Sequence, residues 1–270
     1  MKLRVIQWNI HLNSLAEETK EFLAAKIGTG QTLVCLEEVT PRRFRYLVTS
    51  LRPTSSCFSL NLHQPGGNEA KGGKLGVAML GFGLKVGFPK LLGRCAFPER
   101  TLSARIEVTT GHFRVVAFHS LTSSNHQEHK PKNFALIADY LRRNRKKIDF
   151  LCCDANGPRH DSMDPAKLEF SPKYDKGEVK KAALILGAEK VHDLTDSYVD
   201  YLRSKGEVVT RDPLAVSYKT GTQGQKHGER RYDYIMHSPK WRVVQCAYPY
   251  DESVATHSDH SAVIADFELE

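Results

Sequence analysis

The chain has 270 residues, of which 40% are hydrophobic and 26% are charged. This composition is ordinary for a globular protein and excludes collagen-like, low-complexity and disordered classes. Lys and Arg total 39 against 31 Asp and Glu, so the formal net charge is +8, and the isoelectric point is about 9.1. Such a protein attracts polyanions such as nucleic acids or anionic lipid headgroups, although many basic proteins bind neither.

The sequence also predicts the cellular setting. No apolar run approaches the roughly 18 to 20 residues of a membrane helix. The first ten residues are too short and too polar for a secretion signal, because Gln7 and Asn9 interrupt the apolar stretch. We therefore expect a cytoplasmic monomer with no membrane span. The six cysteines are expected to be reduced and packed as small hydrophobic residues, with Cys152 and Cys153 on opposite faces of a strand.

Strand patterns recur along the whole chain as short runs rich in Val, Ile, Leu and Phe. In chain order they cover residues 3–8, 32–36, 75–80, 102–108, 113–119, 148–153, 232–236, 241–247 and 261–269. The runs at 102–108 and 113–119 are separated by a short Thr-Thr-Gly segment, which is typical of a hairpin.

Helical patterns lie between several of these strands. Ser14 and Glu17 have the spacing of a capping box, which predicts a helix that ends near Ile27. Further helices are expected over residues 42–51, 132–147 and 178–186. The strands and helices interleave without a repeat or a break in composition, which predicts one α/β domain over residues 1–270.

Polar residues suited to phosphate and metal chemistry follow several of the strands. The motifs are Trp8-Asn9, Glu37-Glu38, His119-Ser120, Asp154-Ala155-Asn156-Gly157, Arg231-Tyr232-Asp233 and Ser258-Asp259-His260. A buried strand that ends in a lone carboxylate loses hydration, which is costly unless a cation or a partner neutralises the charge. Oxygen ligands without cysteine or a dense set of histidines suit Mg²⁺ or Mn²⁺ better than Zn²⁺.

Each motif alone has a plainer interpretation. Asn9 is compatible with a turn, Glu38 with a helix cap near Pro41, and His119 with a sheet histidine whose hydrogen bonds are satisfied. The segment 154–157 has turn chemistry, and the pair 259–260 is compatible with the surface. If all of these plainer interpretations held together, every motif would have to occur in this order by chance.

In this order, the motifs resemble those of the endonuclease/exonuclease/phosphatase superfamily over nearly the whole chain. That superfamily includes pancreatic-type DNases, exonuclease III-like apurinic endonucleases, neutral sphingomyelinases and inositol polyphosphate 5-phosphatases. The resemblance implies an α/β four-layer sandwich of two packed mixed β-sheets flanked by helices. It does not resolve the subfamily, because the residues after Asn9 lack the Gly-Arg pattern of the apurinic endonucleases and Cys-Asp-Ala-Asn-Gly replaces the 5-phosphatase signature.

The resemblance implies a metal site that holds Mg²⁺ or Mn²⁺. Glu38 would bind the ion, Asn9 would help to hold it, and Asp259 would lie near it. Glu37 stands where glutamine is common in the superfamily, so it is the weaker candidate as a ligand.

The resemblance also implies the catalytic roles. Asp154 would orient or deprotonate the attacking water, and Asn156 and His119 would bind the phosphate. His260 would face the scissile phosphate, and Asp233 would fix its tautomer. An Asp–His pair favours a charged imidazole, which can donate to the anion that develops during phosphodiester cleavage. The sequence leaves open whether His260 or Asp154 takes the proton of the water.

The expected function is hydrolysis of nucleic acid, either DNA or RNA, by a divalent-metal-dependent nuclease, most plausibly of the DNase type. Arg100, Lys71, Lys74 and the basic loop that ends at Arg231 are candidates for contacts with the substrate. A phosphatase or phosphodiesterase for a small molecule or a phospholipid is the alternative on the same fold. A non-catalytic binding module is disfavoured, because binding alone does not require the whole motif set.

Overall fold

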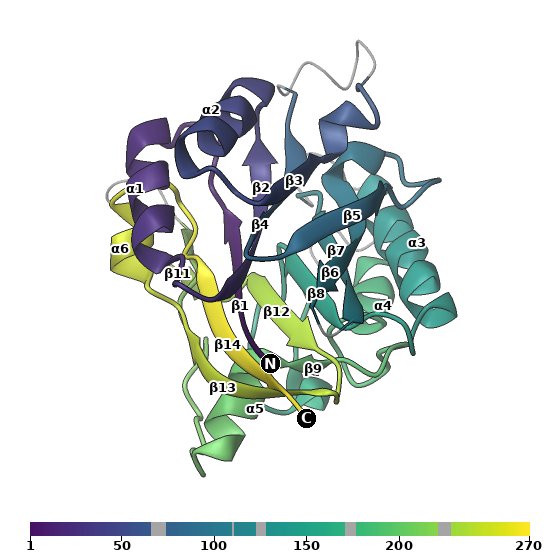
Figure 1. The fold of residues 1–270 in the computed structure, drawn as a ribbon. Helices are drawn as coiled ribbons and strands as arrows, with labels where there is room; N and C mark the ends of the chain where they lie inside the picture. The colour runs from purple at the N-terminus through teal and green to yellow at the C-terminus, as the bar shows by residue number, and fades with distance from the viewer. Residues whose placement is uncertain (66–73, 110, 123–127, 171–176, 221–227) are drawn as a thin grey trace.

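The computed structural model describes residues 1–65, 74–109, 111–122, 128–170, 177–220 and 228–270. Within these residues the chain forms two mixed six-stranded sheets that pack against each other, with helices on their outer faces (Figure 1). The predicted α/β sandwich of two packed mixed sheets flanked by helices is confirmed.

The first sheet carries the amino-terminal motifs. Its strands are β1 (Lys2–Asn9), β2 (Gln31–Val39), β3 (Ser55–Phe58), β4 (Gly76–Phe82), β13 (Trp241–Ala247) and β14 (Val263–Leu269), in the order β13-β14-β1-β2-β4-β3. β1 and β2 are parallel, with Asn9 paired to Glu37. Since parallel strands end at the same edge of a sheet, these two polar residues lie side by side.

The second sheet carries the other motifs. Its strands are β5 (Lys85–Lys90), β6 (Thr101–Val108), β7 (Gly111–His119), β8 (Phe150–Asp154), β9 (Thr195–Asp196) and β12 (Asp233–His237), in the order β5-β6-β7-β8-β12-β9. Asp154 ends β8 and is paired with His119 of parallel β7 on one side and with Asp233 of antiparallel β12 on the other. A separate hairpin consists of β10 (Tyr218–Thr220) and β11 (Gly228–Arg230).

The helices complete the outer layers. They are α1 (Ala16–Lys26), α2 (Pro41–Leu51), α3 (His129–Arg143), α4 (Glu178–Ala183), α5 (Ser197–Ser204) and α6 (Tyr250–Val254). α1 and α2 pack on the outer face of the first sheet, and α3 and α4 on that of the second (Figure 1).

The predicted capping box at the start of α1 is wrong. The cap residue is Leu15, whose backbone is extended and which makes no side-chain cap bond. The Ser14 hydroxyl instead lies 3.3 Å from the hydroxyl of Thr19. The expectation for α3 was right in type, but the helix begins at His129 and ends at Arg143, short of residue 147.

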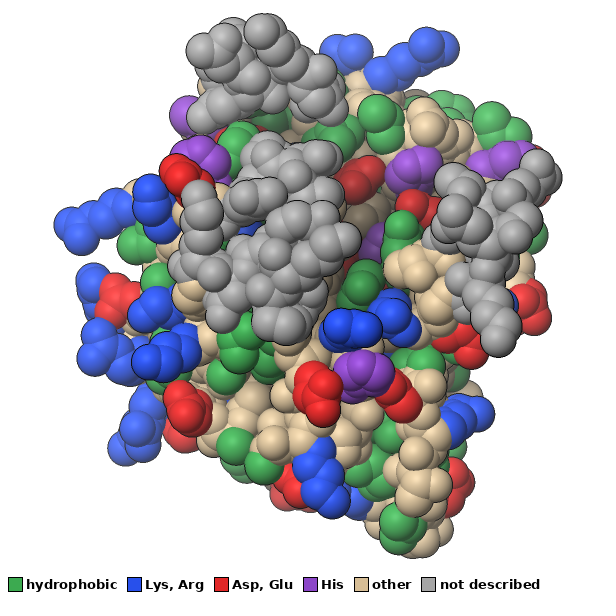
Figure 2. All heavy atoms as spheres, turned by 180° about the vertical axis from the view of Figure 1, so that it is seen from behind, with side chains coloured by type: hydrophobic (Ala, Val, Ile, Leu, Met, Phe, Trp, Pro, Cys, Tyr) green, Lys and Arg blue, Asp and Glu red, His purple; other side chains and the backbone are tan. Residues whose placement is uncertain are grey.

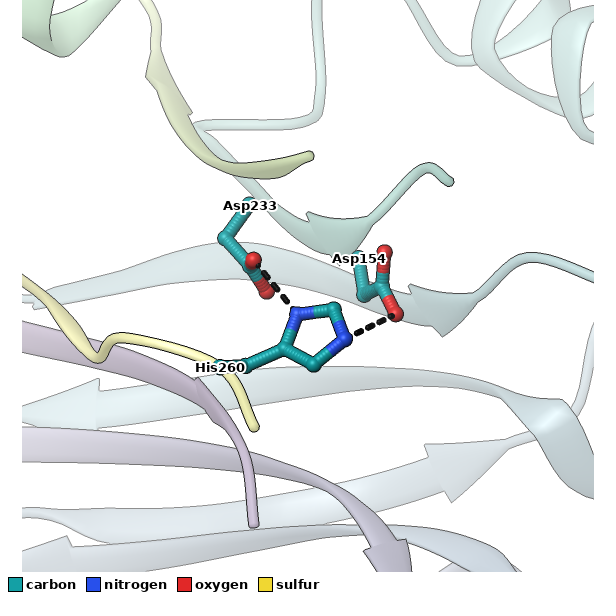
Figure 3. A group of neighbouring side chains, drawn as sticks. All are labelled: Asp154, Asp233 and His260. Carbon is teal, nitrogen blue, oxygen red and sulfur yellow. Dashed lines mark hydrogen bonds and ion pairs between the residues drawn. The ribbon is translucent and has the colours of Figure 1, made fainter. Parts of the chain in front are cut away.

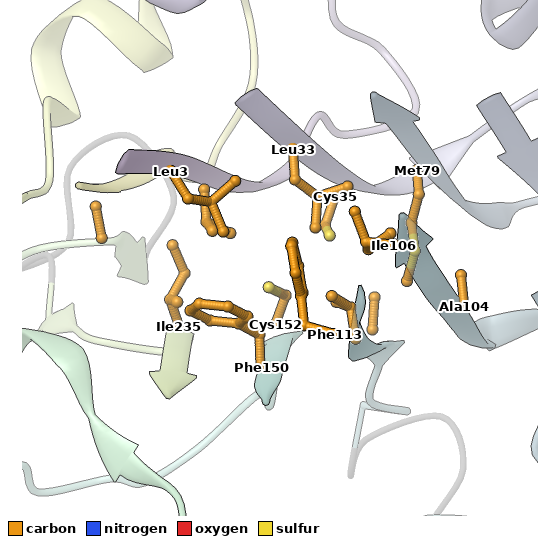
Figure 4. Packing of buried hydrophobic residues seen from close by; sticks show 14 of the residues in the cluster. Leu3, Leu33, Cys35, Met79, Ala104, Ile106, Phe113, Phe150, Cys152 and Ile235 are labelled. Carbon is orange, nitrogen blue, oxygen red and sulfur yellow. The ribbon is translucent and has the colours of Figure 1, made fainter. Parts of the chain in front are cut away.

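Alternation along the strands divides the apolar residues between layers. In β1, Leu3 and Val5 enter the core between the sheets, and Ile6 and Trp8 face α1 and α2. Cys152 of β8 faces the inter-sheet core and Cys153 faces the α3 side, as expected for adjacent strand residues. Figure 4 shows apolar side chains of the two sheets meeting in this inter-sheet core. All six cysteines are buried and free.

The inward-facing rows change from apolar to polar at one edge of the sandwich. In β8, the row of Phe150 and Cys152 continues to Asp154, and in β12 the inward-facing Ile235 is preceded two positions earlier by Asp233. The same alternation in β7 leads to His119. This edge of the inter-sheet core is therefore where the polar motifs meet.

The two chain ends lie at the opposite edge. β14 runs antiparallel to β1, with Lys2 paired to Glu268, and the backbone N–H of Leu269 donates to the carbonyl of Met1 at 3.0 Å. Figure 1 shows the N- and C-termini as neighbours. Among the described residues, no helix is long and apolar enough to cross a membrane.

Candidate active site

Asp154 is the centre of the polar edge. Its side chain is buried, and its Oδ2 accepts hydrogen bonds from Nδ2 of Asn9 at 3.0 Å and from Nδ2 of Asn156 at 3.2 Å. Its Oδ1 accepts from the backbone N–H of Asn156 at 2.9 Å. Asn9 comes from the first sheet and Asp154 from the second, so this carboxylate joins the two sheets.

His260 faces the same carboxylate from the other side. Its Nδ1 lies 2.8 Å from Oδ2 of Asp233, and its Nε2 lies 3.8 Å from Oδ2 of Asp154. Figure 3 shows the imidazole between the two carboxylates. Because the Nδ1–H donates to Asp233, the ring orientation is fixed and Nε2 is directed toward Asp154.

Hydrogen bonds and ring contacts hold the segment before β14 and so position the imidazole of His260. The indole N–H of Trp8 donates to the backbone carbonyl of His260 at 3.0 Å, and the hydroxyl of Ser258 donates to the carbonyl of Asn9 at 2.8 Å. The ring of Tyr218 packs against the imidazole, with ring centroids 4.8 Å apart, and it stacks on Tyr232.

Burial and charge shift the pKa values of this pair in an interpretable way. Burial raises the pKa of Asp154 to about 7, against the lowering effect of the His260 charge. Burial alone would lower the pKa of His260, but the charges of Asp233 and Asp154 outweigh it and raise the value to about 10. The imidazole is therefore a cation at neutral pH, held between two acidic groups.

Glu38 projects from an irregular end of β2. The pairing of β2 with β4 shifts register between Leu36 and Val39, and Glu38 has a φ of 55°. This bulge and its left-handed residue redirect the side chain, which would otherwise alternate with that of Glu37. Its Oε1 lies 3.6 Å from Nε2 of His119, and its Oε2 accepts from the backbone N–H of Leu12 at 3.1 Å.

Arg100 adds a cation to the same edge. It ends the short 3₁₀ turn Pro98–Arg100, and its Nη1 lies 3.4 Å from Nδ1 of His119. Burial lowers its pKa, while Glu38, Glu99 and Asp154 act in the opposite direction. A guanidinium among these groups can bind an anion with several donors.

Glu37 lies beneath the site rather than in it. Its side chain is buried, and its Oε2 accepts from Nε2 of Gln7 at 2.9 Å, while the same Gln7 amide donates to Asp233 at 3.1 Å. Burial, followed by the charges of Asp233 and Asp154, raises the pKa of Glu37 well above its usual range. This shift favours the neutral acid form of Glu37.

The residues expected to hold a divalent cation have suitable donor chemistry. Glu38, Asn9 and Asp259 offer oxygen donors and no cysteine sulfur, with Oε2 of Glu38 and Oδ1 of Asn9 also accepting the backbone N–H groups of Leu12 and His11. Oδ1 of Asp259 is buried and accepts no hydrogen bond within the described residues, although its side chain as a whole is 45% exposed. This oxygen lies 4.0 Å from Nε2 of His260, and a carboxylate oxygen that accepts no hydrogen bond suits a hard cation.

By distance alone, a second group of residues could hold a metal. Ligand atoms of Asp154, Asp233 and His260 lie within 4.8 Å of one another. A protonated imidazole has no free lone pair, however, and His260 is cationic here. This group is better described as a charge-paired histidine.

Only some of the residues expected to contact the substrate lie at the site. Arg100 is at the site, and Lys74 is exposed just before β4. Lys71 lies outside the described residues. Arg231 is only 1% exposed and binds Asp161 and Asp196, so this guanidinium links segments of the fold and does not line a groove.

On the face shown in Figure 2, acidic and histidine side chains gather around a hollow. The motif residues that the structure brings together are Asn9, Glu38, His119, Asp154, Asn156, Asp233 and His260. Sequence reasoning missed Gln7 and Tyr218. The signal for Gln7 was a polar residue at an inward position of an otherwise apolar strand.

No family model matches the chain, and no curated protein matches it by sequence. Solved structures do match. Zebrafish (D. rerio) TDP2 in complex with a single-strand DNA product has a TM-score of 0.66 at 15% identity and covers 99% of each chain. The human Nocturnin catalytic domain with a bound sulfate anion has a TM-score of 0.67 at 18% identity and covers 100% of this chain and 95% of its own.

A protein described as an endonuclease/exonuclease/phosphatase, from Bacteroides vulgatus, matches over 100% of both chains with a TM-score of 0.64 and 14% identity. This chain has the endonuclease/exonuclease/phosphatase fold. The resemblance inferred from the motifs is therefore supported by the arrangement of the backbone. In this fold the polar edge described above stands between the two sheets, at the ends of the strands that carry the motifs.

Proposed function

We propose that the protein is a divalent-metal-dependent phosphodiesterase that hydrolyses nucleic acid as a DNase-type nuclease. The observation that carries the proposal is the imidazole of His260, which is held by Asp233 and directed at the buried Asp154. This arrangement provides a proton acceptor and a cationic donor at one point, which in-line attack by water on a phosphodiester requires.

In this proposal His260 stabilises negative charge. Its raised pKa keeps Nε2 protonated, so it can donate to a non-bridging oxygen of the phosphate as charge develops. Asp233 accepts the Nδ1 proton and thereby selects the productive orientation of the ring. Arg100 and His119 supply additional donors on the other side of Asp154.

Asp154 is the group we assign to the water. Asn9 and Asn156 fix both of its oxygens by hydrogen bonds, so a water that donates to it is aimed from a constant position. A carboxylate whose pKa burial has raised to about 7 is also well matched to accepting a proton near neutral pH. The amide of Asn156 donates to this oxygen and to the carbonyl of Ser120, so it can donate to the phosphate only by exchanging one of these two bonds.

Glu38, Asn9 and Asp259 are the residues proposed to hold Mg²⁺ or Mn²⁺. Such an ion, when bound, polarises the phosphoryl oxygens and offsets their charge. The bulge that turns Glu38 out of its strand row makes its carboxylate available for this role.

Two observations support nucleic acid as the substrate. The chain carries a net charge of +8, which favours association with a polyanion. One structural neighbour, zebrafish TDP2, was solved with a single-strand DNA product.

The test uses the purified chain with supercoiled plasmid, single-stranded DNA and single-stranded RNA, in Mg²⁺ or Mn²⁺ and with or without EDTA. We expect metal-dependent cleavage of at least one of these substrates. His260→Ala and Asp154→Asn should each lower kcat by about 10²- to 10⁴-fold, the range of a positioned acid or base. Cleavage that persists in both variants, or in EDTA, contradicts the assignment.

A panel of phosphate esters decides between nucleic acid and the alternative substrates. The alternative is a small-molecule or lipid phosphatase of the same fold. It would be favoured if a soluble monoester or a phospholipid headgroup is hydrolysed while all three nucleic acids stay intact. If no phosphate ester is turned over, the remaining hypothesis is a non-catalytic binding protein.

A further inference from the structure

Lys130 occupies a position that is unusual for a lysine. It lies in the first turn of α3, is only 1% exposed, and its Nζ is 2.8 Å from Oε1 of Glu178 at the start of α4. The Glu178 side chain is also buried. Lysine and glutamate are almost never fully buried unless they are paired, and the two charges here meet this condition.

Burying such a pair does little for stability by itself. The loss of hydration of two ions commonly cancels their attraction, and an apolar pair of similar volume is often equally stable or better. An additional bond of Lys130 offers a reason for the pair. The same Nζ donates to the backbone carbonyl of Asn156 at 2.9 Å.

Asn156 is held in an unfavourable conformation. Its φ is 47°, in the left-handed region, and such residues persist when the surroundings determine them from several directions. Its N–H donates to Asp154, its side-chain amide donates to Asp154 and to the carbonyl of Ser120, and its carbonyl accepts from Lys130. Lys130 therefore fixes the part of this residue that Asp154 does not touch.

We propose that Lys130, neutralised by Glu178, is a positioning residue that locks the peptide after Asn156 and so keeps the Asn156 amide in its hydrogen bond to Asp154. The inference rests on the proposed function. Lys130 is too deeply buried to meet the substrate itself, so its effect must pass through Asn156. Through Glu178 it also links the catalytic edge to α4.

The main variant is Lys130→Met/Glu178→Met, which removes both charges and the donor without leaving an unpaired ion. Lys130→Arg keeps a charged donor, and Lys190→Met is the matched control. Lys190 is a partly buried lysine that donates to the carbonyl of Leu194, away from the catalytic residues. If circular dichroism shows that the double methionine variant does not fold, Lys130→Met/Glu178→Gln replaces it.

With a DNA oligonucleotide in Mg²⁺, we expect kcat of the double variant to fall about 10- to 100-fold, as for a displaced catalytic group, and KM to change little. Lys130→Arg should recover most of kcat, and Lys190→Met should match the wild type. An unchanged kcat in the double variant overturns the inference.

Two further measurements separate a positioning role from a merely structural one. In an Asn156→Gly background, which removes the amide at a φ that glycine tolerates, the double methionine change should lower kcat no further. A loss of the same size in both backgrounds overturns the inference.

A crystal structure of the double variant tests positioning without reference to activity. We expect Asn156 to leave the left-handed region or its amide to turn away from Asp154. An unmoved Asn156 overturns the inference even if the protein proves to be active. If the wild type cleaves no phosphodiester, the proposed function fails, but this structural result still decides whether Lys130 holds Asn156.

Discussion

Asp154→Asn offers the sharpest test of the electrostatics of the site, because it removes a buried charge and changes little else. Asp154 has a pKa raised by burial to about 7, against an ordinary value of 3.8. Between these values the folded protein keeps a proton that the unfolded chain releases. The free energy of unfolding of the wild type therefore falls as pH rises through this window. The whole destabilisation from the buried carboxylate is present above pH 7.

The magnitude follows from the size of the shift. Each pKa unit corresponds to about 1.4 kcal/mol, and the group is still half protonated at pH 7, so from pH 5 to pH 7 the wild type should lose roughly 2 kcal/mol relative to the asparagine variant. The variant also loses hydrogen bonds from Asn9 or Asn156, worth about 1 kcal/mol each. That loss does not depend on pH, so the difference between the two pH values isolates the charge.

The measurement is urea unfolding of both proteins in EDTA at pH 5, 6, 7 and 8, followed by tryptophan fluorescence. Trp8 is a suitable reporter because it is buried and bonded to the His260 carbonyl. Asp139→Asn is the control, because Arg142 and Arg143 lower the pKa of this partly exposed carboxyl, so its contribution to stability should stay constant from pH 5 to pH 8. A stability difference for Asp154→Asn that stays constant from pH 5 to pH 8 refutes the reasoning.

Three other substitutions test separate parts of the site. Asp233→Asn removes the charge that raises the pKa of His260 to about 10, so the alkaline limit of kcat should move to lower pH and kcat should fall about 10²- to 10⁴-fold; an unmoved limit contradicts the pairing. Burial favours the neutral form of Glu37, which Glu37→Gln replaces by a neutral amide of similar shape, so the free energy of unfolding in urea at pH 7 should change by less than about 1 kcal/mol; a large loss would contradict the direction of this shift. Arg100→Ala should raise KM for DNA about tenfold while Arg100→Lys recovers only part, since lysine lacks the planar fork; equal effects of both would argue against bidentate binding.

The sequence predicted the fold class and the convergence of the motifs for an identifiable reason. Strand residues alternate between faces, and parallel strands end at the same edge, so polar residues that follow apolar strands must meet. Asn9 and Asp154 end their strands and fit this logic, whereas Asp233 begins the antiparallel β12 and reaches the same edge by pairing with Asp154. The assignment of ligand and catalytic roles goes beyond alternation and remains a prediction that the variants above test.

The errors come from features that are not local in sequence. Arg231 belongs to a basic segment beside Asp233, but distant acids at positions 161 and 196 draw it into the interior. Ser14 has the spacing of a cap, yet Leu15 takes that position because its backbone is extended. The buried pairing of Lys130 with Glu178 joins residues nearly fifty positions apart, which no periodicity reveals.

The neighbouring chain ends offer a practical route to test the proposed activity. Met1 and Leu269 are joined by a backbone hydrogen bond at the edge opposite Asn9. A fluorophore or a surface tether attached there would leave the polar edge that carries the motifs free. A short peptide could also connect the ends, so that new termini opened in an exposed turn would yield a circular permutant whose cleavage activity can be compared directly with the parent.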